Sequence, residues 1–272
     1  MAGKLSNYAE NKMLDHILKV ASFTRPAALF LGLCTGDPLD AGTGGSITEP
    51  DTGTDVDASY VRKSCDNWAA AASRATSNGA LITFEDAITD WDAITHFAIL
   101  DTVTLLTGNV IAYGAVTPNK TFLTGNTPGV AIGDLDVSVD AAGASDYLAN
   151  KILDHLLKDD AYTQPAAIFV ALCTATIADN DTGTTISEPG ENYARIGHDD
   201  WKIAAAGASS NSDTIVFAKA TGGTWGTISH FGLCDSLTTG NLLIHAALNT
   251  SQPIEIGDIA QWTDGALDIT MD

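Results

Sequence analysis

The chain has 272 residues and a net charge of −21, because 34 Asp and Glu residues outnumber 13 Lys and Arg residues. Such an acidic surface repels nucleic acid and anionic membranes, so we expect neither as a partner. No apolar run is long enough to cross a bilayer, and the N-terminus lacks the apolar core of a signal peptide. The sequence therefore predicts an acidic globular protein that is made and folded in a cytosol.

The first predicted element is a short helix. Asn7 can cap its N-terminus, and Glu10 can complete a capping box three residues later. Apolar residues then follow at helical spacing, namely Met13, Leu14, Ile17 and Leu18. A helix of about four turns is marginal alone, so we expect its apolar face to pack on another element.

The rest of the first half has the pattern of short strands separated by turns. An apolar run at 27–34 comes first, and a loop of more than twenty residues, 36–59, follows it. Further strand-like segments lie at 60–65, 81–84, 94–100, 110–115, 120–123 and 135–139. Short strands at this spacing are typical of an antiparallel sandwich or barrel.

The second half of the chain repeats the first. The sequence Asn-Lys-Met-Leu-Asp-His-Ile-Leu-Lys at 11–19 returns in closely similar form at 150–158, an offset of 139 that narrows to 132 near the end. Other matched pairs are Glu49 and Glu188, Tyr60 and Tyr193, Arg62 and Arg195, Trp68 and Trp201, Trp91 and Trp225, and His96 and His230. We predict two tandem units, 1–143 and 144–272, each with a short N-terminal helix and an antiparallel β-sandwich of jelly-roll type.

Two histidines lie on the predicted helices, each directly after an aspartate. Neighbouring helix residues do not face each other. We therefore expect that Asp15 does not orient His16 and that Asp154 does not orient His155. No nucleophile lies nearby. We interpret the pair as a polar helix edge that fixes the helix against its sheet or a neighbouring subunit.

The remaining histidines do not form a metal-binding pattern. His96 and His230 lie beside phenylalanines in apolar strands, and the spacings H-E-x-x-H and C-x-x-C are absent. We predict half-buried side chains at both positions. His245 has Tyr113 as its counterpart, which argues against a site shared by both units.

Acidic loops are the better candidates for a structural cation. Asp51, Asp55 and Asp57 lie close together, as do Asp179 and Asp181, and calcium binds such oxygens. Neither group has the EF-hand pattern, and the two loops do not match each other. A solvated acidic surface is the favoured interpretation, and a weakly held cation is the alternative.

The aromatic residues and cysteines read as core positions. The matched tryptophans at 68, 91, 201 and 225 predict packing inside the fold, whereas Trp262 has no match and is a candidate surface contact or carbohydrate platform. We predict that the four cysteines are buried free thiols, and a disulfide or a metal site is the alternative. The cysteines are Cys34, Cys65, Cys173 and Cys234. The loop glycines form no phosphate-binding motif.

Several segments resemble a family of tailed-bacteriophage structural proteins that are often labelled phage tail fibre proteins. The similar segments are Pro-Ala-Ala-[LI]-Phe at 26–30 and 165–169 with the strands that follow them, Ser-Glu-Pro-Gly with Tyr-Ala-Arg at 187–195, and Trp-Gly-Thr-Ile-Ser-His-Phe-Gly-Leu-Cys-Asp at 225–235. The helix motif at the start and the close of the second half at 240–270 are similar as well. Members commonly have one unit, so two in tandem are a departure.

The resemblance implies a non-enzymatic virion structural protein, made in the host cytoplasm, of the tail or of a fibre or adsorption apparatus. The alternative is a capsid decoration protein that reinforces the head shell. A carbohydrate-binding module and a glycan depolymerase are further alternatives. We expect other virion proteins as partners, a homo-oligomer with a trimer favoured, no cofactor, and no catalytic, cofactor-binding or metal-ligating residues. The loops 36–59 and 175–192 are either contact surfaces or tolerated insertions.

Overall fold

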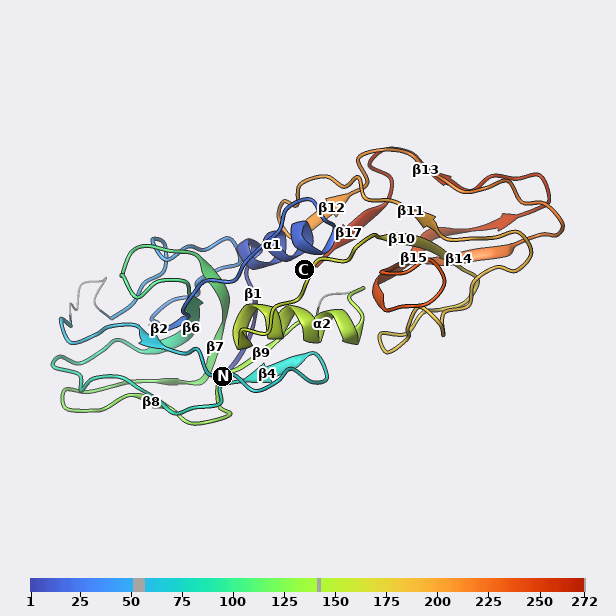
Figure 1. Cartoon of the computed structure of the whole chain (residues 1–272). Helices are drawn as coiled ribbons and strands as arrows, with labels where there is room; N and C mark the ends of the chain where they lie inside the picture. Colours follow the sequence, from blue (N-terminus) through green and yellow to red (C-terminus); the bar gives the residue numbers. More distant parts are fainter. Residues whose placement is uncertain (51–56, 141–142, 272) are drawn as a thin grey trace. The chain divides into compact units, whose positions relative to one another are not determined.

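The computed structural model describes residues 1–50, 57–140 and 143–271, and these are mainly β (Figure 1). The chain divides into two compact units. Unit 1 contains Met1–Glu10, Thr24–Asp140 and Asn150–Tyr162, and unit 2 contains Asn11–Phe23, Ala141–Ala149 and Thr163–Asp272. The predicted mainly β class is confirmed. No helix in the described part of the chain is long and apolar enough to cross a membrane.

Unit 1 is built on a curled sheet of seven strands in the order β3-β2-β6-β7-β1-β9-β4. Neighbouring strands are antiparallel, except that β1 and β9 are parallel. A separate antiparallel pair joins β5 to β8. The strands are β1 (Ala2–Leu5), β2 (Phe30–Cys34), β3 (Lys63–Ser64), β4 (Ala75–Ser77), β5 (Ile82–Thr83), β6 (Ile94–Leu100), β7 (Val110–Lys120), β8 (Gly129–Val130) and β9 (Asp136–Ser138).

Glycine allows β1 to approach β7 closely. Gly3 lies opposite Gly114 in the antiparallel register. A Cβ atom on Gly114 would lie 2.1 Å from the backbone oxygen of Ala2, far inside van der Waals contact. The N-terminal strand can therefore join the sheet only because these positions lack side chains.

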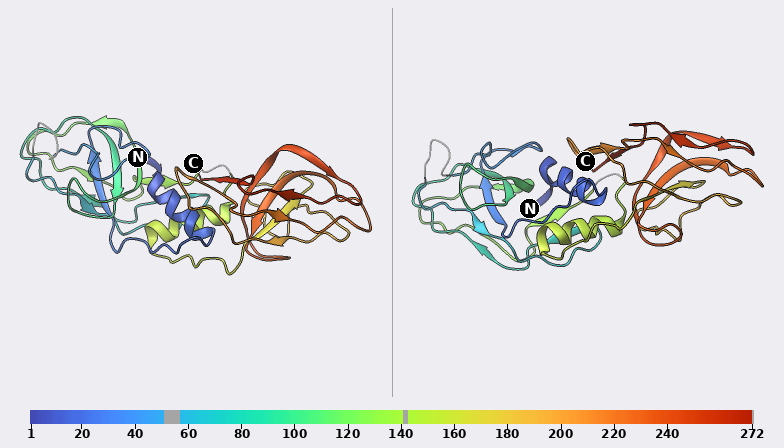
Figure 2. Two further views of the ribbon diagram at one scale, coloured as in Figure 1. Left: turned by 90° about the horizontal axis from the view of Figure 1, so that it is seen from above. Right: turned by 45° about the horizontal axis from the view of Figure 1, so that its top comes forward.

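Unit 2 repeats five of these strand pairings. A four-stranded antiparallel sheet has the order β11-β10-β14-β15, and two further pairs are β12 with β17 and β13 with β16. Even the register recurs, because Cys34 lies opposite His96 and Cys173 lies opposite His230. The strands are β10 (Phe169–Cys173), β11 (Ile196–Gly197), β12 (Ala208–Ser210), β13 (Ile215–Val216), β14 (Gly226–Cys234), β15 (Leu242–Ile254), β16 (Gln261–Trp262) and β17 (Asp268–Thr270). The long strands β14 and β15, in orange and red, lie side by side in Figure 2.

The cores of the two units lie on the corresponding sheets. In unit 1 a buried cluster contains Cys34, Ile47, Ala98, Leu100, Val110 and Tyr113. In unit 2 the cluster contains Ala171, Cys173, Ile177, Ile186, Cys234 and Leu242. Both clusters join the central strands to the loop after the first of them, so this loop is part of the folded core.

Each half of the chain supplies one helix. These are α1 (Asn7–Ile17) and α2 (Asp146–Leu153), and α2 continues as a π-helical turn, η1 (Asp154–Lys158). The prediction that Asn7 caps α1 is wrong, because Asn7 is the first helical residue and Ser6 is the cap. Ser6 Oγ accepts from Ala9 N at 3.4 Å and donates to Val110 O. The Ser6 hydroxyl thus both caps the helix and binds β7.

Two predicted strands differ from the observed ones. The segment 60–65 contains only β3, because Tyr60 binds β2 through its side chain, whose oxygen accepts from Leu33 N at 2.8 Å. The segment 120–123 is not a separate strand. Lys120 ends β7, and Phe122 O accepts from Trp91 N at 2.8 Å instead of pairing in the sheet.

Candidate functional site: the helix-hairpin junctions and the Glu-Tyr-Arg clusters

The recurring helix motif binds a hairpin tip. Within unit 2, Asn11 Oδ1 accepts from Gly207 N at 2.9 Å, and Asp15 Oδ1 accepts from Ala204 N at 2.8 Å. Residues four apart lie on the same face of a helix, so both acceptors point to the same partner. We call this contact the unit 2 junction.

The geometry of the hairpin explains why it needs these acceptors. Ala205 and Ala208 exchange backbone hydrogen bonds around a two-residue turn, in which Ala206 and Gly207 have φ angles of 50° and 70°. Two positive φ angles are the mark of a type I′ turn. This pairing leaves the N–H groups of Ala204 and Gly207 without backbone acceptors. An unpaired buried N–H is costly, so the helix side chains stabilise the tip.

The same arrangement occurs in unit 1. Asn150 Oδ1 accepts from Arg74 N at 2.9 Å, and Asp154 Oδ1 accepts from Ala71 N at 2.8 Å. Here Ser73 and Arg74 occupy the turn, with φ angles of 51° and 65°. The motif of the first half thus binds a hairpin of the second half, and the motif of the second half binds a hairpin of the first.

Each helix histidine accepts a hydrogen bond from the backbone of the segment that follows its helix. His16 Nδ1 accepts from Phe23 N at 3.0 Å, and His155 Nδ1 accepts from Tyr162 N at the same distance. Both imidazoles are buried. Asp15 and His16 bind different partners, as expected for neighbouring helix residues.

A buried ion pair organises the loops of unit 1. Arg62 and Glu49 both have fully buried side chains, and Arg62 Nη2 donates to Glu49 Oε2 at 2.8 Å. Tyr60 Oη donates to Glu49 Oε1 at 2.8 Å. Burial raises the pKa of Tyr60 well above its ordinary value, and the Glu49 charge raises it further. We call these residues the Glu-Tyr-Arg cluster.

Arg62 also joins two loops through their carbonyl groups. Its Nη1 donates to the backbone oxygens of Thr102, Thr104 and Thr107 at 3.1, 2.9 and 3.1 Å, and its Nη2 donates to Gly44 O at 3.3 Å. The planar guanidinium suits this task because its donors point in several fixed directions. The start of the long loop and the turn between β6 and β7 are therefore held as one body.

Unit 2 contains the same cluster in a more open form. Arg195 donates to Glu188 Oε1 and Oε2 at 3.0 and 2.8 Å, and Tyr193 Oη donates to Glu188 Oε1 at 3.1 Å. The Glu188 side chain is 22% exposed, whereas Glu49 is 0% exposed. The sequence signal for this cluster is the recurrence of matched acidic, tyrosine and arginine positions, which by itself indicates no role.

Asp57 acts as a hydrogen-bond acceptor and not as a cation ligand. Its buried carboxylate accepts from Ser59 N, Ile88 N and Trp91 Nε1 at 2.8, 2.9 and 2.7 Å. Burial raises its pKa, but hydrogen bonds from Ser59 and Trp91 outweigh burial and hold the pKa well below the ordinary value. Asp57 thus faces donors, whereas a cation would need free oxygens. Asp51 and Asp55 lie outside the described residues.

The second acidic loop is also engaged in local contacts. Asp181 accepts from Ala178 N at 2.7 Å and from Thr185 Oγ1 at 2.8 Å, and these bonds lower its pKa. Asp179 Oδ1 lies 3.1 Å from His245 Nε2. Among the described residues, no group of three or more His, Cys, Asp and Glu side chains is arranged to hold a metal ion.

The strand histidines lie apart from any such group. Tyr113, the counterpart of His245, donates to Asp40 Oδ1 at 3.3 Å, so the two positions make equivalent contacts with different chemistry. His96 and His230 are half-buried, as predicted, and each contacts the hydroxyl of the preceding residue at 2.9 Å. Burial lowers the pKa of His230, and nearby His245 lowers it further.

The predicted core positions are confirmed for the tryptophans and the cysteines. All four matched tryptophans are at most 5% exposed, and all four cysteines are free and buried. Trp262 is half-buried, with its ring centroid 6.1 Å from those of both Phe217 and Phe231.

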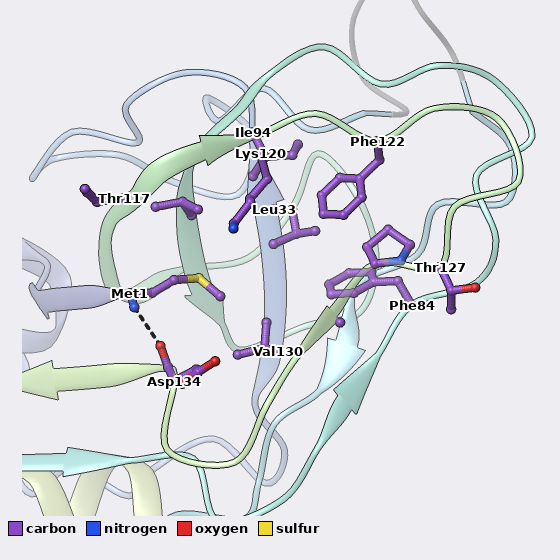
Figure 3. Close-up of a pocket in the computed structure, with 13 residues that line it drawn as sticks. Met1, Leu33, Phe84, Ile94, Thr117, Lys120, Phe122, Thr127, Val130 and Asp134 are labelled. Carbon is purple, nitrogen blue, oxygen red and sulfur yellow. Dashed lines mark hydrogen bonds between the residues drawn. The ribbon is translucent and has the colours of Figure 1, made fainter.

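Each unit has a pocket in the corresponding place, beside the small pair β5–β8 or β13–β16. The unit 1 pocket has a volume of about 530 Å³ and is lined by aromatic and aliphatic side chains together with two threonines, Lys120 and Asp134 (Figure 3). Met1 N donates to Asp134 O at 2.7 Å across one side of it (Figure 3).

The unit 2 pocket differs in chemistry. Its volume is about 400 Å³, and Trp262 occupies the position that Val130 has in unit 1, opposite the first residue of the facing strand. Its polar lining is uncharged and consists of Asn249, Thr250, Gln252 and Gln261. Uncharged amide and hydroxyl groups beside an indole ring can bind a neutral polar ligand.

Comparison with known proteins gives one clear result. No curated protein matches the chain. The family model described as "Podophage GP4 fiber I protein gp80" matches residues 4–138 and 143–270, which is nearly the whole chain. The chain therefore belongs to this family of podophage fibre proteins, which are structural, non-enzymatic components of the virion.

Proposed function

We propose that the chain is a rigid building block of a phage fibre that works by packing and by presenting preformed loops to other virion proteins. We infer two sequence repeats, 1–143 and 144–272, each of which contributes one helix and one set of strands. A β-sandwich of jelly-roll form for each repeat stays a prediction. The observation that carries the proposal is the Glu-Tyr-Arg cluster, which fixes surface loops in both units.

Rigid loops suit a protein that assembles. A loop that is already ordered loses little conformational freedom on binding, so more of the contact energy appears as affinity. Arg62 and Arg195 each fix two loops to one another through backbone carbonyls. The described residues of the loops 36–59 and 175–192 are thus our proposed contact surfaces with neighbouring virion proteins.

The position in the particle can be tested by immunogold electron microscopy of intact virions with antibody against this chain. We expect gold at the tail or its fibres. Gold on the head would overturn the proposal and favour a capsid decoration protein. Particles that contain the chain but bind no gold would indicate a covered internal position and would contradict the presentation of loops.

The oligomeric state is a separate proposal. We favour a homotrimer, as the resemblance to fibre proteins implies, and the acidic surface would keep free subunits soluble before assembly. Light scattering after size-exclusion chromatography should give three times the chain mass of 28.2 kDa. A stable monomer or dimer over a hundredfold concentration range would contradict the trimer.

The unit 2 pocket supports carbohydrate binding as a second candidate function. Its uncharged polar lining and the half-buried Trp262 provide hydrogen-bonding groups and a surface for stacking. Screening on a glycan array followed by calorimetry should reveal micromolar binding that Trp262→Ala abolishes. Val130→Ala, at the corresponding position of unit 1, should leave it unchanged. Equal binding by both variants would exclude this pocket.

A further inference from the structure

We propose that each hairpin tip is a docking site for a helix that carries Asn and Asp four residues apart, and that its partner is a second copy of the same repeat. Two repeats would interlock by exchanging helices, whether they belong to one chain or to two. In this chain the exchange occurs between its own two halves. The inference concerns what holds the repeats together and is independent of the proposed contact loops.

The first argument is the division of the chain. Asn11–Phe23 belong to unit 2, and Asn150–Tyr162 belong to unit 1. Each compact unit therefore takes the main part of its helix from the other half of the sequence. Such a reciprocal exchange of an identical element is the defining property of a domain-swapped pair.

The second argument is the chemistry of the docking site. A type I′ tip leaves two N–H groups that its own strands do not satisfy, and the helix provides two oxygens at the matching spacing. These acceptors lie beside an apolar face that is fully buried in both helices. In α1 the face consists of Met13, Leu14 and Ile17, followed by Leu18; in the second helix it consists of Ile152, Leu153, Leu156 and Leu157.

The third argument is that the contact extends beyond the motif. In unit 2, Lys19 Nζ donates to Asp199 Oδ2 at 2.6 Å and to Ala166 O at 2.7 Å. In unit 1, Arg25 Nη1 donates to Leu157 O at 3.1 Å. Each exchanged segment is therefore fixed at the helix and at the end of the helix, so the exchange does not depend on a single pair of side chains.

This arrangement makes the peptide link between the halves dispensable once the chain has folded. The test is to insert a protease recognition sequence after Asp140, purify the folded chain, cleave it and measure its mass by light scattering. We expect both fragments to elute together at the mass of the intact chain, and to separate only in denaturant. Fragments that separate in native buffer would overturn the proposal.

Variants show whether the junctions cause the association. Replacing Asn11, Asp15, Asn150 and Asp154 by alanine should weaken the cleaved complex at least a hundredfold. The matched control exchanges Asn for Asp and Asp for Asn at these positions. It keeps an acceptor oxygen at each site, so the complex should persist. If the fragments of the alanine variant bind each other as tightly as the unmodified fragments do, the junctions are not the cause of the association.

Smaller variants keep the test decisive if the fourfold variant does not fold. Asn11→Ala with Asp15→Ala removes the polar contacts of one junction only. It should weaken the complex about tenfold, and an unchanged dissociation constant would contradict the proposal.

A last experiment tests exchange with a second copy. Cleaved chain labelled with ¹⁵N and unlabelled cleaved chain are unfolded together in urea and refolded by dialysis. Native mass spectrometry should then detect complexes that contain one labelled and one unlabelled fragment. If the fragments refold into complexes but none of the complexes contains one labelled and one unlabelled fragment, the tips do not accept a helix from another copy.

Discussion

Asp15 accepts a hydrogen bond of 2.8 Å from the backbone N–H of Ala204, a residue 189 positions further along the chain. Its counterpart Asp154 binds Ala71 N at the same distance across 83 positions. The recurring helix motif is thus explained by a pair of contacts that are distant in sequence and equivalent in geometry.

Asp15→Ala should lower the free energy of unfolding by about 1–3 kcal/mol, because it leaves the buried N–H of Ala204 without an acceptor. Urea denaturation followed by circular dichroism measures the loss. Asp15→Asn keeps an acceptor oxygen and should lose less. Equal losses for the two variants would show that the negative charge, and not the acceptor, is what stabilises the junction.

Arg62→Ala should destabilise the protein by about 3–5 kcal/mol, since it leaves the Glu49 carboxylate buried without its ion pair. Arg195→Ala is the matched variant in unit 2. Glu188 is 22% exposed and can be hydrated, so the loss should be smaller. Denaturation midpoints of the two variants test this order, and a larger loss for Arg195→Ala would contradict the role of burial.

Asp57 should make stability depend on pH. Its pKa is below the ordinary value in the folded protein, so its stabilising contribution is present above the unfolded pKa of about 3.9 and is lost as pH falls through the folded value. In thermal unfolding at pH 7, the wild-type protein should have a higher transition temperature than Asp57→Asn. This difference in transition temperature should shrink below about pH 4. Parallel curves from pH 7 to pH 3 would exclude this linkage.

Gly44→Ala should destabilise unit 1, because a Cβ atom there would lie 1.8 Å from Thr107 O, an atom that Arg62 also binds. The loop must move and loosen the Glu-Tyr-Arg cluster. Gly36→Ala, whose Cβ would meet no atom within 4 Å, is the control and should be neutral. Differential scanning calorimetry distinguishes them, and equal transition temperatures would contradict the close contact.

The cysteines should be unreactive in the native protein. Burial raises the pKa of Cys173 to about 12, with a further increase from Glu188, and burial likewise raises that of Cys34 well above its ordinary value. A chromogenic disulfide reagent at pH 8 should therefore detect no thiol until denaturant is added, and four per chain afterwards. Fast reaction of one thiol in native buffer would show an opening at that site.

Local sequence patterns predicted those elements whose structure is determined by residues within the same segment. The strand expected at 94–100 is observed with those bounds, and the helix begins where the cap signals lie, one residue away from the predicted cap. The matched tryptophans and cysteines are buried because apolar side chains at equivalent positions have the same surroundings in both units.

The sequence could not predict what the helix docks on. An apolar face shows that a helix must pack, but the partner of Asn11 is a glycine 196 positions away, and no local pattern identifies it. For the same reason the recurrence of Glu49 and Arg62 in the second half did not reveal that they form a buried pair. The acidic loop that contains Asp57 was interpreted as solvated, because two of the donors to Asp57, Ile88 N and Trp91 Nε1, come from a segment about thirty residues later.

The division of the helices between the units has a consequence for biosynthesis. Unit 1 includes Asn150–Tyr162, so this unit cannot be completed on the ribosome until translation has passed well into the second half of the message. The segment Asn11–Phe23 must wait even longer, because its hairpin at 204–208 is made later still. The two halves therefore complete their folding together late in synthesis. A translation product that ends before Asn150 would leave α1 without the hairpin at 204–208 and the hairpin at 71–75 without the second helix.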